Sequence, residues 1–139
     1  MILLDTNVLS ALMLQRPDEA VVDWLDQQPR TSVWTTSITV FEIRFGLQAM
    51  PAGKRRSLLL LGFERLLNTA IQQRIASFDS AAAQQAGDLM AARQKKGRPG
   101  DLRDTMIAGI VLATHATLAT RNVKHFEDIS SSVVNPWNA

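Results

Sequence analysis

The hydrophobic positions of this chain form short continuous runs, separated by longer segments with helical periodicity. Short apolar runs without alternation are typical of strands that are buried on both faces of a parallel sheet. The chain opens with such a run, MILL, and the carboxylate of Asp5 follows it directly. The predicted strands are Ile2–Leu4, Ser32–Thr35, Ile75–Phe78, Thr117–Ala119 and a short last strand at Val133-Val134.

Helical spacing and helix-start residues mark the segments between these strands. Ser37, Asp79 and Asp101 stand where N-cap residues are expected. Strands that alternate with helices favour an α/β fold with a mainly parallel central sheet of four to five strands and helices on both faces. Without a repeat or a linker, residues 1–139 are expected to form a single domain. The predicted helices cover residues 7–14, a segment starting at 17–19, and residues 37–49, 54–70, 79–96 and 101–115.

Composition and charge narrow the possible functions. The chain has no cysteine, which excludes thiolate catalysis and cysteine-based zinc sites and fits a reducing compartment. The opening segment and the LLLLG run lack the length and flanks of a signal peptide or membrane span, so we expect a soluble, cytoplasmic protein. The net charge of +2 divides into −3 over residues 1–40 and +5 over the remainder. A polyanion could approach the basic part, although ordinary solvated helix faces explain the same asymmetry.

Three carboxylates stand where a surface role is not the obvious explanation. Asp5 ends a buried strand, at the edge where parallel sheets form their sites. Glu42 lies in ITVFEIRFG among apolar helical neighbours, where an acid that pairs with an arginine is the alternative. Asp104 lies one turn into a helix, and the alternative is a capping box in which Asp101 and Asp104 satisfy backbone amides. For Asp101 we prefer the capping role.

These three acids would form a catalytic centre if the fold brings them to one edge of the sheet. Like charges cannot share a small volume without compensation, and a divalent cation supplies it. Oxygen ligands without Cys or clustered His favour Mg²⁺, for which Mn²⁺ can substitute, over zinc. Such a site suits phosphodiester hydrolysis.

Other polar residues beside these acids could support the site. Thr6 and Asn7 follow Asp5, and each could orient it, although Asn7 could equally be the N-cap of the first helix. Asn122 could offer a carbonyl oxygen, or it could cap the segment 123–126. Thr120 and Arg121 share its strand end. Candidate phosphate contacts are Arg44, Arg98, Arg103 and Lys124, with Arg93, Lys95, Lys96 and Arg121 as further candidates.

The remaining histidines and tryptophans suggest no chemistry of their own. His115 and His125 lie near helix ends, where an imidazole is usually structural, and no nucleophile stands beside them. Trp24, Trp34 and Trp137 are expected to pack in cores or against partners. None of these five residues is therefore assigned to the site.

Four segments of the chain follow one another in this order: ILLDTNVLS, ITVFEIRFG, GRPGDLRDTMIAGIVLATHATLATRNVKHF and VVNPW. With these four segments, the chain resembles a PIN domain, and within that family the VapC/FitB type of toxin from bacterial toxin–antitoxin pairs. The resemblance implies a PIN-like three-layer fold and a Mg²⁺-dependent endoribonuclease that hydrolyses RNA. It implies that Asp5 and Asp104 hold the metal and that Glu42 completes the acidic centre.

The resemblance also implies partners and one departure from the family pattern. It implies a homodimer and a small, DNA-binding cognate antitoxin whose tail covers the acidic pocket. The family's fourth acidic position, often Asp in the T-R-[DN] segment, falls on Asn122. This substitution weakens the charge available for a second metal.

Two other functions stay open at this point. Phosphatases with an aspartyl nucleophile also place an acid after a buried strand, but they resemble D-x-D, and here the third position is Asn7. A non-catalytic PIN-fold module that binds RNA or protein would tolerate Asn122 more easily than an enzyme would. Metal titration and RNA cleavage separate these alternatives.

Overall fold

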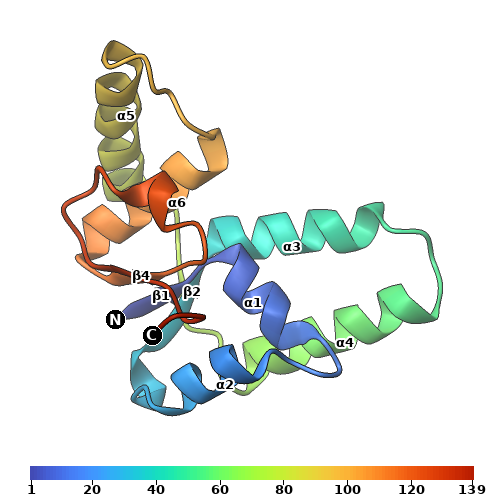
Figure 1. Cartoon of the computed structure of the whole chain (residues 1–139). Helices are drawn as coiled ribbons and strands as arrows, with labels where there is room; N and C mark the ends of the chain where they lie inside the picture. Colours follow the sequence, from blue (N-terminus) through green and yellow to red (C-terminus); the bar gives the residue numbers. More distant parts are fainter.

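A single parallel sheet organises the chain in the computed structural model, which describes residues 1–139 (Figure 1). The five strands lie in the order β3-β2-β1-β4-β5, and every neighbouring pair is parallel. The strand β1 is central, with Ile2 aligned to Val33 on one side and to Thr117 on the other. The strands are β1 (Ile2–Leu4), β2 (Val33–Thr36), β3 (Ile75–Ala76), β4 (Thr117–Ala119) and β5 (Val133–Val134).

Helices connect these strands, as the alternating pattern predicts. The prediction that Asp79 and Asp101 are N-caps is confirmed, because each side chain accepts a hydrogen bond from a backbone N–H in the first turn. The helices are α1 (Thr6–Met13), α2 (Glu19–Asp26), α3 (Ser37–Ala49), α4 (Lys54–Asn68), α5 (Ser80–Lys95) and α6 (Leu102–Thr114), with 3₁₀ turns η1 (Arg30–Ser32) and η2 (Val123–Phe126).

Two cap predictions are wrong, and one strand is shorter than expected. Thr36, and not Ser37, caps α3, because the Thr36 hydroxyl accepts from the backbone N–H of Thr39. Asp5, and not Asn7, is the N-cap of α1. The edge strand β3 pairs only with β2 and ends at Ala76, after which the Phe78 N–H donates to the Ser37 hydroxyl.

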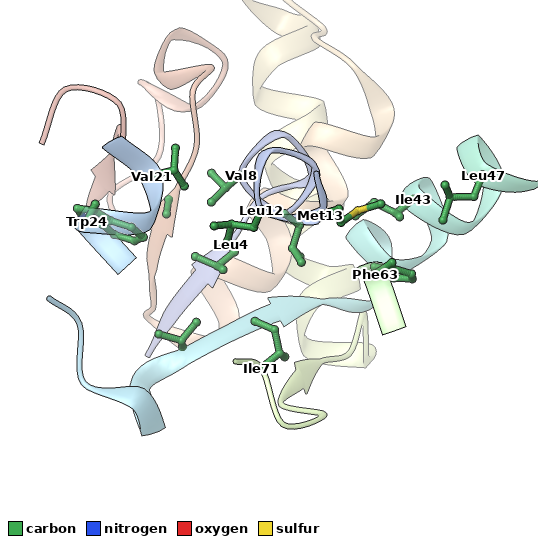
Figure 2. Close-up of a cluster of buried hydrophobic side chains, with 13 residues drawn as sticks. Leu4, Val8, Leu12, Met13, Val21, Trp24, Ile43, Leu47, Phe63 and Ile71 are labelled. Carbon is green, nitrogen blue, oxygen red and sulfur yellow. The ribbon is translucent and has the colours of Figure 1, made fainter. Parts of the chain in front are cut away.

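Two hydrophobic clusters cover the two faces of the sheet. Leu3 and Leu4, both fully buried, point to opposite faces, which explains why the opening run does not alternate. The Leu4 side is covered by α1, α2 and α4 with part of α3, and Figure 2 shows this cluster around Leu4, Val8 and Phe63. The Leu3 side is covered mainly by α5 and α6. The expected three-layer α/β fold is therefore confirmed.

Small residues bring α5 and α6 into close contact and so fix the position of α6. A side chain at Gly109 would have its Cβ 2.5 Å from the Ala82 carbonyl oxygen and 2.7 Å from the Ala86 Cβ. The backbones approach this closely only because glycine has no Cβ. None of the helices has the length and apolar character that a membrane span requires.

Candidate functional site

Asp5 lies where β1 ends and α1 begins, and only 3% of its surface is exposed. Its Oδ1 accepts a hydrogen bond from the Thr6 N–H at 2.8 Å. Its Oδ2 accepts from the Thr120 hydroxyl at 2.7 Å and from the Asn7 amide at 3.3 Å. These neutral donors offset part of the cost of burying the carboxylate and hold it in one orientation.

No cation of the chain compensates the charge of Asp5, which belongs to none of the three ion pairs. Burial raises the pKa of Asp5 above its usual value, and the negative charge of Asp104 raises it further. Hydrogen bonds from Thr120, Thr6 and Asn7 act in the opposite direction without overcoming the burial. The carboxylate is thus held rigidly in a place that disfavours its charge unless a cation arrives.

Glu42 faces the same corner from α3. Its Oε1 accepts a hydrogen bond from the Thr6 hydroxyl at 3.1 Å, and its Oε2 lies 3.9 Å from Arg103 Nη1. Burial raises the pKa of Glu42, and the charges of Asp5 and Asp104 raise it further, against the lowering influence of Thr6 and Arg103. The alternative of an arginine partner is therefore present, but as a loose contact that does not cancel the neighbouring carboxylates.

The apolar surroundings expected around Glu42 are found on only one side. Ile38 is buried, whereas Phe45 is 58% exposed and Phe41 is 57% exposed. The two phenyl rings stack on each other with centroids 6.5 Å apart. Glu42 therefore stands between the core and an exposed aromatic pair.

Asp104 reaches the site from the first turn of α6. Its backbone N–H donates to Asp101 Oδ1 at 3.1 Å, which confirms Asp101 as the cap and leaves the Asp104 carboxylate free for another role. Its Oδ2 lies 2.9 Å from His125 Nδ1. A carboxylate in the first turn also benefits from the helix dipole. Asp104 therefore faces the site without serving as a cap.

The three acids influence one another electrostatically, but they do not form a ready-made set of metal ligands. The charge of Asp104 acts on Asp5 and on Glu42, and that of Asp5 acts on Glu42, so the acids are neighbours. No group of three His, Cys, Asp or Glu side chains is close enough to hold a metal by itself. Mg²⁺ commonly binds through one or two carboxylates and keeps several waters, so Asp5 and Asp104 fit its requirements.

Thr120 and Asn7 connect the acidic corner to the end of β4. The Thr120 hydroxyl, fully buried, accepts from the Asn122 N–H at 3.0 Å while it donates to Asp5. Asn7 Oδ1 accepts from the Arg121 N–H at 3.0 Å. Asn122 occupies the expected N-cap position of η2, but its side chain makes no capping hydrogen bond there.

The basic candidates differ widely in availability. Arg98 and Lys124 line a cavity of about 280 Å³ beside Asp104 and His125, and this cavity has no hydrophobic wall. Its lining also includes four carboxylates, so it is not strongly positive. Arg103 lies near Glu42, and Arg44 is exposed on α3. As phosphate contacts, Arg98, Lys124, Arg103 and Arg44 stay predictions.

Arg93 is the one basic candidate that the structure removes. It is 5% exposed and donates to both oxygens of Asp128 at 2.8 Å, to the Thr105 hydroxyl at 3.0 Å and to the His125 carbonyl at 2.9 Å. A guanidinium engaged in this way is a structural clamp and has little capacity left for a phosphate. It joins α5, the start of α6 and η2.

The sequence reasoning missed two features of this region. It gave His125 no partner, although His125 follows the β4 end by a few residues and so lies near the same sheet edge as Asp5. It also missed the Arg93–Asp128 pair, whose members are 35 positions apart. An arginine in an otherwise Ala-rich helix is the only local signal of that pair.

The all-parallel sheet of this α/β fold places Asp5 at its carboxyl edge, with Glu42 and Asp104 as neighbours. The family model described as "PIN domain" matches residues 2–131. The chain therefore belongs to the PIN domain family.

Its relatives within that family are VapC and FitB proteins. The chain is 40% identical over 137 residues to the VapC ribonuclease Y4jK of Sinorhizobium fredii, covering 99% of this chain and 98% of that protein. It is 33% identical over 138 residues to the toxin FitB of Neisseria gonorrhoeae, covering 99% of each. The crystal structure of FitAcB from Neisseria gonorrhoeae matches with a TM-score of 0.88 and 32% identity over 100% of both chains.

Proposed function

We propose that this protein is a Mg²⁺-dependent endoribonuclease that acts as the toxin of a toxin–antitoxin pair. The observation that carries the proposal is the buried Asp5 carboxylate, which shares its corner with Glu42 and Asp104 and has no cation of its own. Relatives named as VapC ribonucleases support RNA as the substrate. An RNA substrate also fits a cytoplasmic location.

Asp5 and Asp104 would hold the divalent cation, with Mn²⁺ able to replace Mg²⁺. When bound, the ion supplies Lewis acidity toward a phosphate oxygen and lowers the pKa of a coordinated water. The charge of Asp104 raises the pKa of Asp5 and of Glu42, so carboxylate oxygens gather where a hard cation would be favoured.

The chain's own residues prepare the site before any ligand binds. Thr120, Thr6 and Asn7 orient Asp5 through three hydrogen bonds. The Thr6 hydroxyl also donates to Glu42, so Thr6 contacts both acids, Asp5 through its backbone N–H and Glu42 through its side chain. Glu42 can accept a proton at the site, because its raised pKa brings its titration closer to neutrality.

The partners that we propose follow from the same relatives. A chain in the solved structure of FitAB bound to the IR36 DNA fragment is 33% identical to this protein, with a TM-score of 0.86. We expect this chain to bind a small cognate antitoxin that binds DNA, and to form a homodimer. The exposed Phe41 and Phe45 beside Glu42 offer the antitoxin an apolar contact at the edge of the site.

The experiment that tests this function is cleavage of total cellular RNA by the purified, antitoxin-free protein. Reactions with Mg²⁺ or Mn²⁺ are compared with EDTA and with the Asp5→Asn variant, and new RNA ends are sequenced. Discrete ends that require metal and Asp5 would support the nuclease. Binding of RNA without cleavage in the presence of either metal would instead favour the non-catalytic PIN-fold module, the alternative that Asn122 leaves open.

A further inference from the structure

Arg121 lies two hydrogen bonds away from Asp5. Its backbone N–H donates to Asn7 Oδ1 at 3.0 Å, and the Asn7 amide donates to Asp5 Oδ2 at 3.3 Å. Its side chain is exposed at the carboxyl end of β4. Arg121 is therefore fixed at the rim of the acidic corner by a backbone contact that does not use its guanidinium.

An aromatic ring, and not a carboxylate, holds the Arg121 side chain. The guanidinium carbon lies 4.7 Å from the centroid of the Trp137 ring. Arg121 belongs to none of the chain's ion pairs. A cation–π contact uses the flat face of the guanidinium and leaves its charge and its in-plane N–H donors available. In this respect Arg121 differs from Arg93, whose donors are engaged, and from Arg103, which has Glu42 beside it.

The C-terminal segment fixes the Trp137 ring in place. The indole N–H donates to Asp18 Oδ2 at 3.2 Å, and the backbone N–H of Trp137 donates to Asn135 Oδ1 at 2.9 Å. The ring also packs against the hydrophobic cluster of α1 and α2, so the chain end returns to this face of the sheet (Figure 1). Trp137 lies outside residues 2–131, the part that the family model matches.

We infer that Arg121, held by Trp137, is a preformed binding site for a phosphate of the RNA backbone next to the cleaved bond. The guanidinium edge would bind two phosphate oxygens, and Trp137 is its positioning residue. A ring that is already anchored reduces the side-chain entropy that the arginine would lose on binding RNA. This inference rests on the proposed function, because it assigns a substrate contact to the same site.

The test measures RNA binding in an inactive Asp104→Asn background, with a fluorescent single-stranded RNA and a salt series. We expect Arg121→Gln to weaken binding about tenfold and to reduce the salt slope by roughly 0.7, the value for one phosphate contact on a single strand. Arg121→Lys should keep the slope but recover only part of the affinity. The matched control is Arg55→Gln, which removes an exposed charge from the first turn of α4 and should change little.

The role of Trp137 is tested by its coupling to Arg121. Trp137→Leu should weaken RNA binding several-fold while the salt slope is kept, and it should have no further effect in an Arg121→Gln chain. A merely structural tryptophan would weaken binding equally in both backgrounds. Trp137→Phe keeps a ring and serves as the second variant if the leucine chain unfolds, with thermal melting as the check on folding.

The outcomes separate this inference from the proposed function. If the native chain cleaves RNA but Arg121→Gln leaves the affinity and the salt slope unchanged, the Arg121 site is wrong and the nuclease stands. Equal losses from Trp137→Leu with and without Arg121 would likewise overturn the positioning role. If the native chain neither cleaves nor binds RNA, both fail.

Discussion

Asp128 and Asp5 both lie near the start of α6, but the fold provides a cation partner for only one of them. Asp128 is bound by the guanidinium of Arg93, whose hydrogen bonds hold the pKa of Asp128 below its usual value. Asp5 is more deeply buried, meets only neutral donors, and has a pKa that burial raises. Arg93 contacts α6 through Thr105, and the charge of the neighbouring Asp104 acts on Asp5.

This difference indicates that Asp128 is a structural acid, whereas Asp5 is the acid that we propose binds a ligand. Where the chain supplies its own cation, charge and hydrogen bonds are satisfied and the group holds three elements together. Where it supplies none, the carboxylate stays ready for an external cation at a cost in stability. The Arg93–Asp128 pair therefore fixes the backbone from which Asp104 approaches, while Asp5 is left without a cation, as the metal ligand that we propose it to be.

We expect the largest effect from removal of Asp5, the acid that has no cation partner. We expect Asp5→Asn to reduce RNA cleavage by roughly 10³-fold or more, because metal contacts supply several kcal/mol and each 1.36 kcal/mol is tenfold in rate. Its free energy of unfolding should be unchanged or slightly higher, because the substitution removes a disfavoured charge. Cleavage assays and urea unfolding measure both, with the exposed Asp23→Asn as the control. Marked unfolding of Asp5→Asn would instead make Asp5 structural.

In contrast to Asp5→Asn, substitutions that remove the Arg93–Asp128 pair should mainly lower stability. Arg93→Met should lower the free energy of unfolding by about 2 kcal/mol, less than for a fully buried pair, because the Asp128 side chain is 38% exposed. Asp128→Asn should cost less, since a neutral amide can still accept from Arg93. Urea unfolding measures both variants. If Arg93→Met were as stable as the native chain, the clamp would not be structural.

The smallest effect is a pH dependence of the metal-free protein. Asp5 and Glu42 have folded-state pKa values above those of the unfolded chain, near 4. They bind protons more tightly when folded, so their contribution to stability is present below pH ~4 and is lost as the pH rises through the raised values. Asp128 contributes the reverse, stability that is lost as the pH falls through its lowered pKa.

Urea unfolding in EDTA between pH 4 and 8 measures these contributions. The decline in stability toward neutral pH should be shallower in Asp5→Asn than in the native chain, while Asp128→Asn should retain the decline. Identical pH profiles for Asp5→Asn and the native chain would contradict the assignment of the decline to Asp5.

The fold was largely predictable because local signals and the global topology agree. Runs such as Ile2–Leu4 and Thr117–Ala119 and the caps Asp79 and Asp101 each mark an element boundary in a few residues. The strand Ile75–Phe78 was predicted too long because edge pairing, which the local pattern does not show, sets where β3 ends.

The acids of the site were predictable as residue types, but their partners were not. Asp5 stands out because an acid after a buried strand is costly, and the structure places Glu42 and Asp104 beside it. Which arginine is free and which is engaged depends on tertiary contacts. Arg93 and Arg121 look alike in the sequence, yet one is buried against Asp128 and the other lies on Trp137.

The most direct test of whether the unpaired acids exist to hold a divalent cation is calorimetric titration of the purified chain with Mn²⁺. We expect saturable binding that is lost in Asp5→Asn and in Asp104→Asn and is kept in Arg121→Gln. Absence of binding in the native chain, or binding unchanged in Asp5→Asn, would contradict the assignment of this corner as a metal centre.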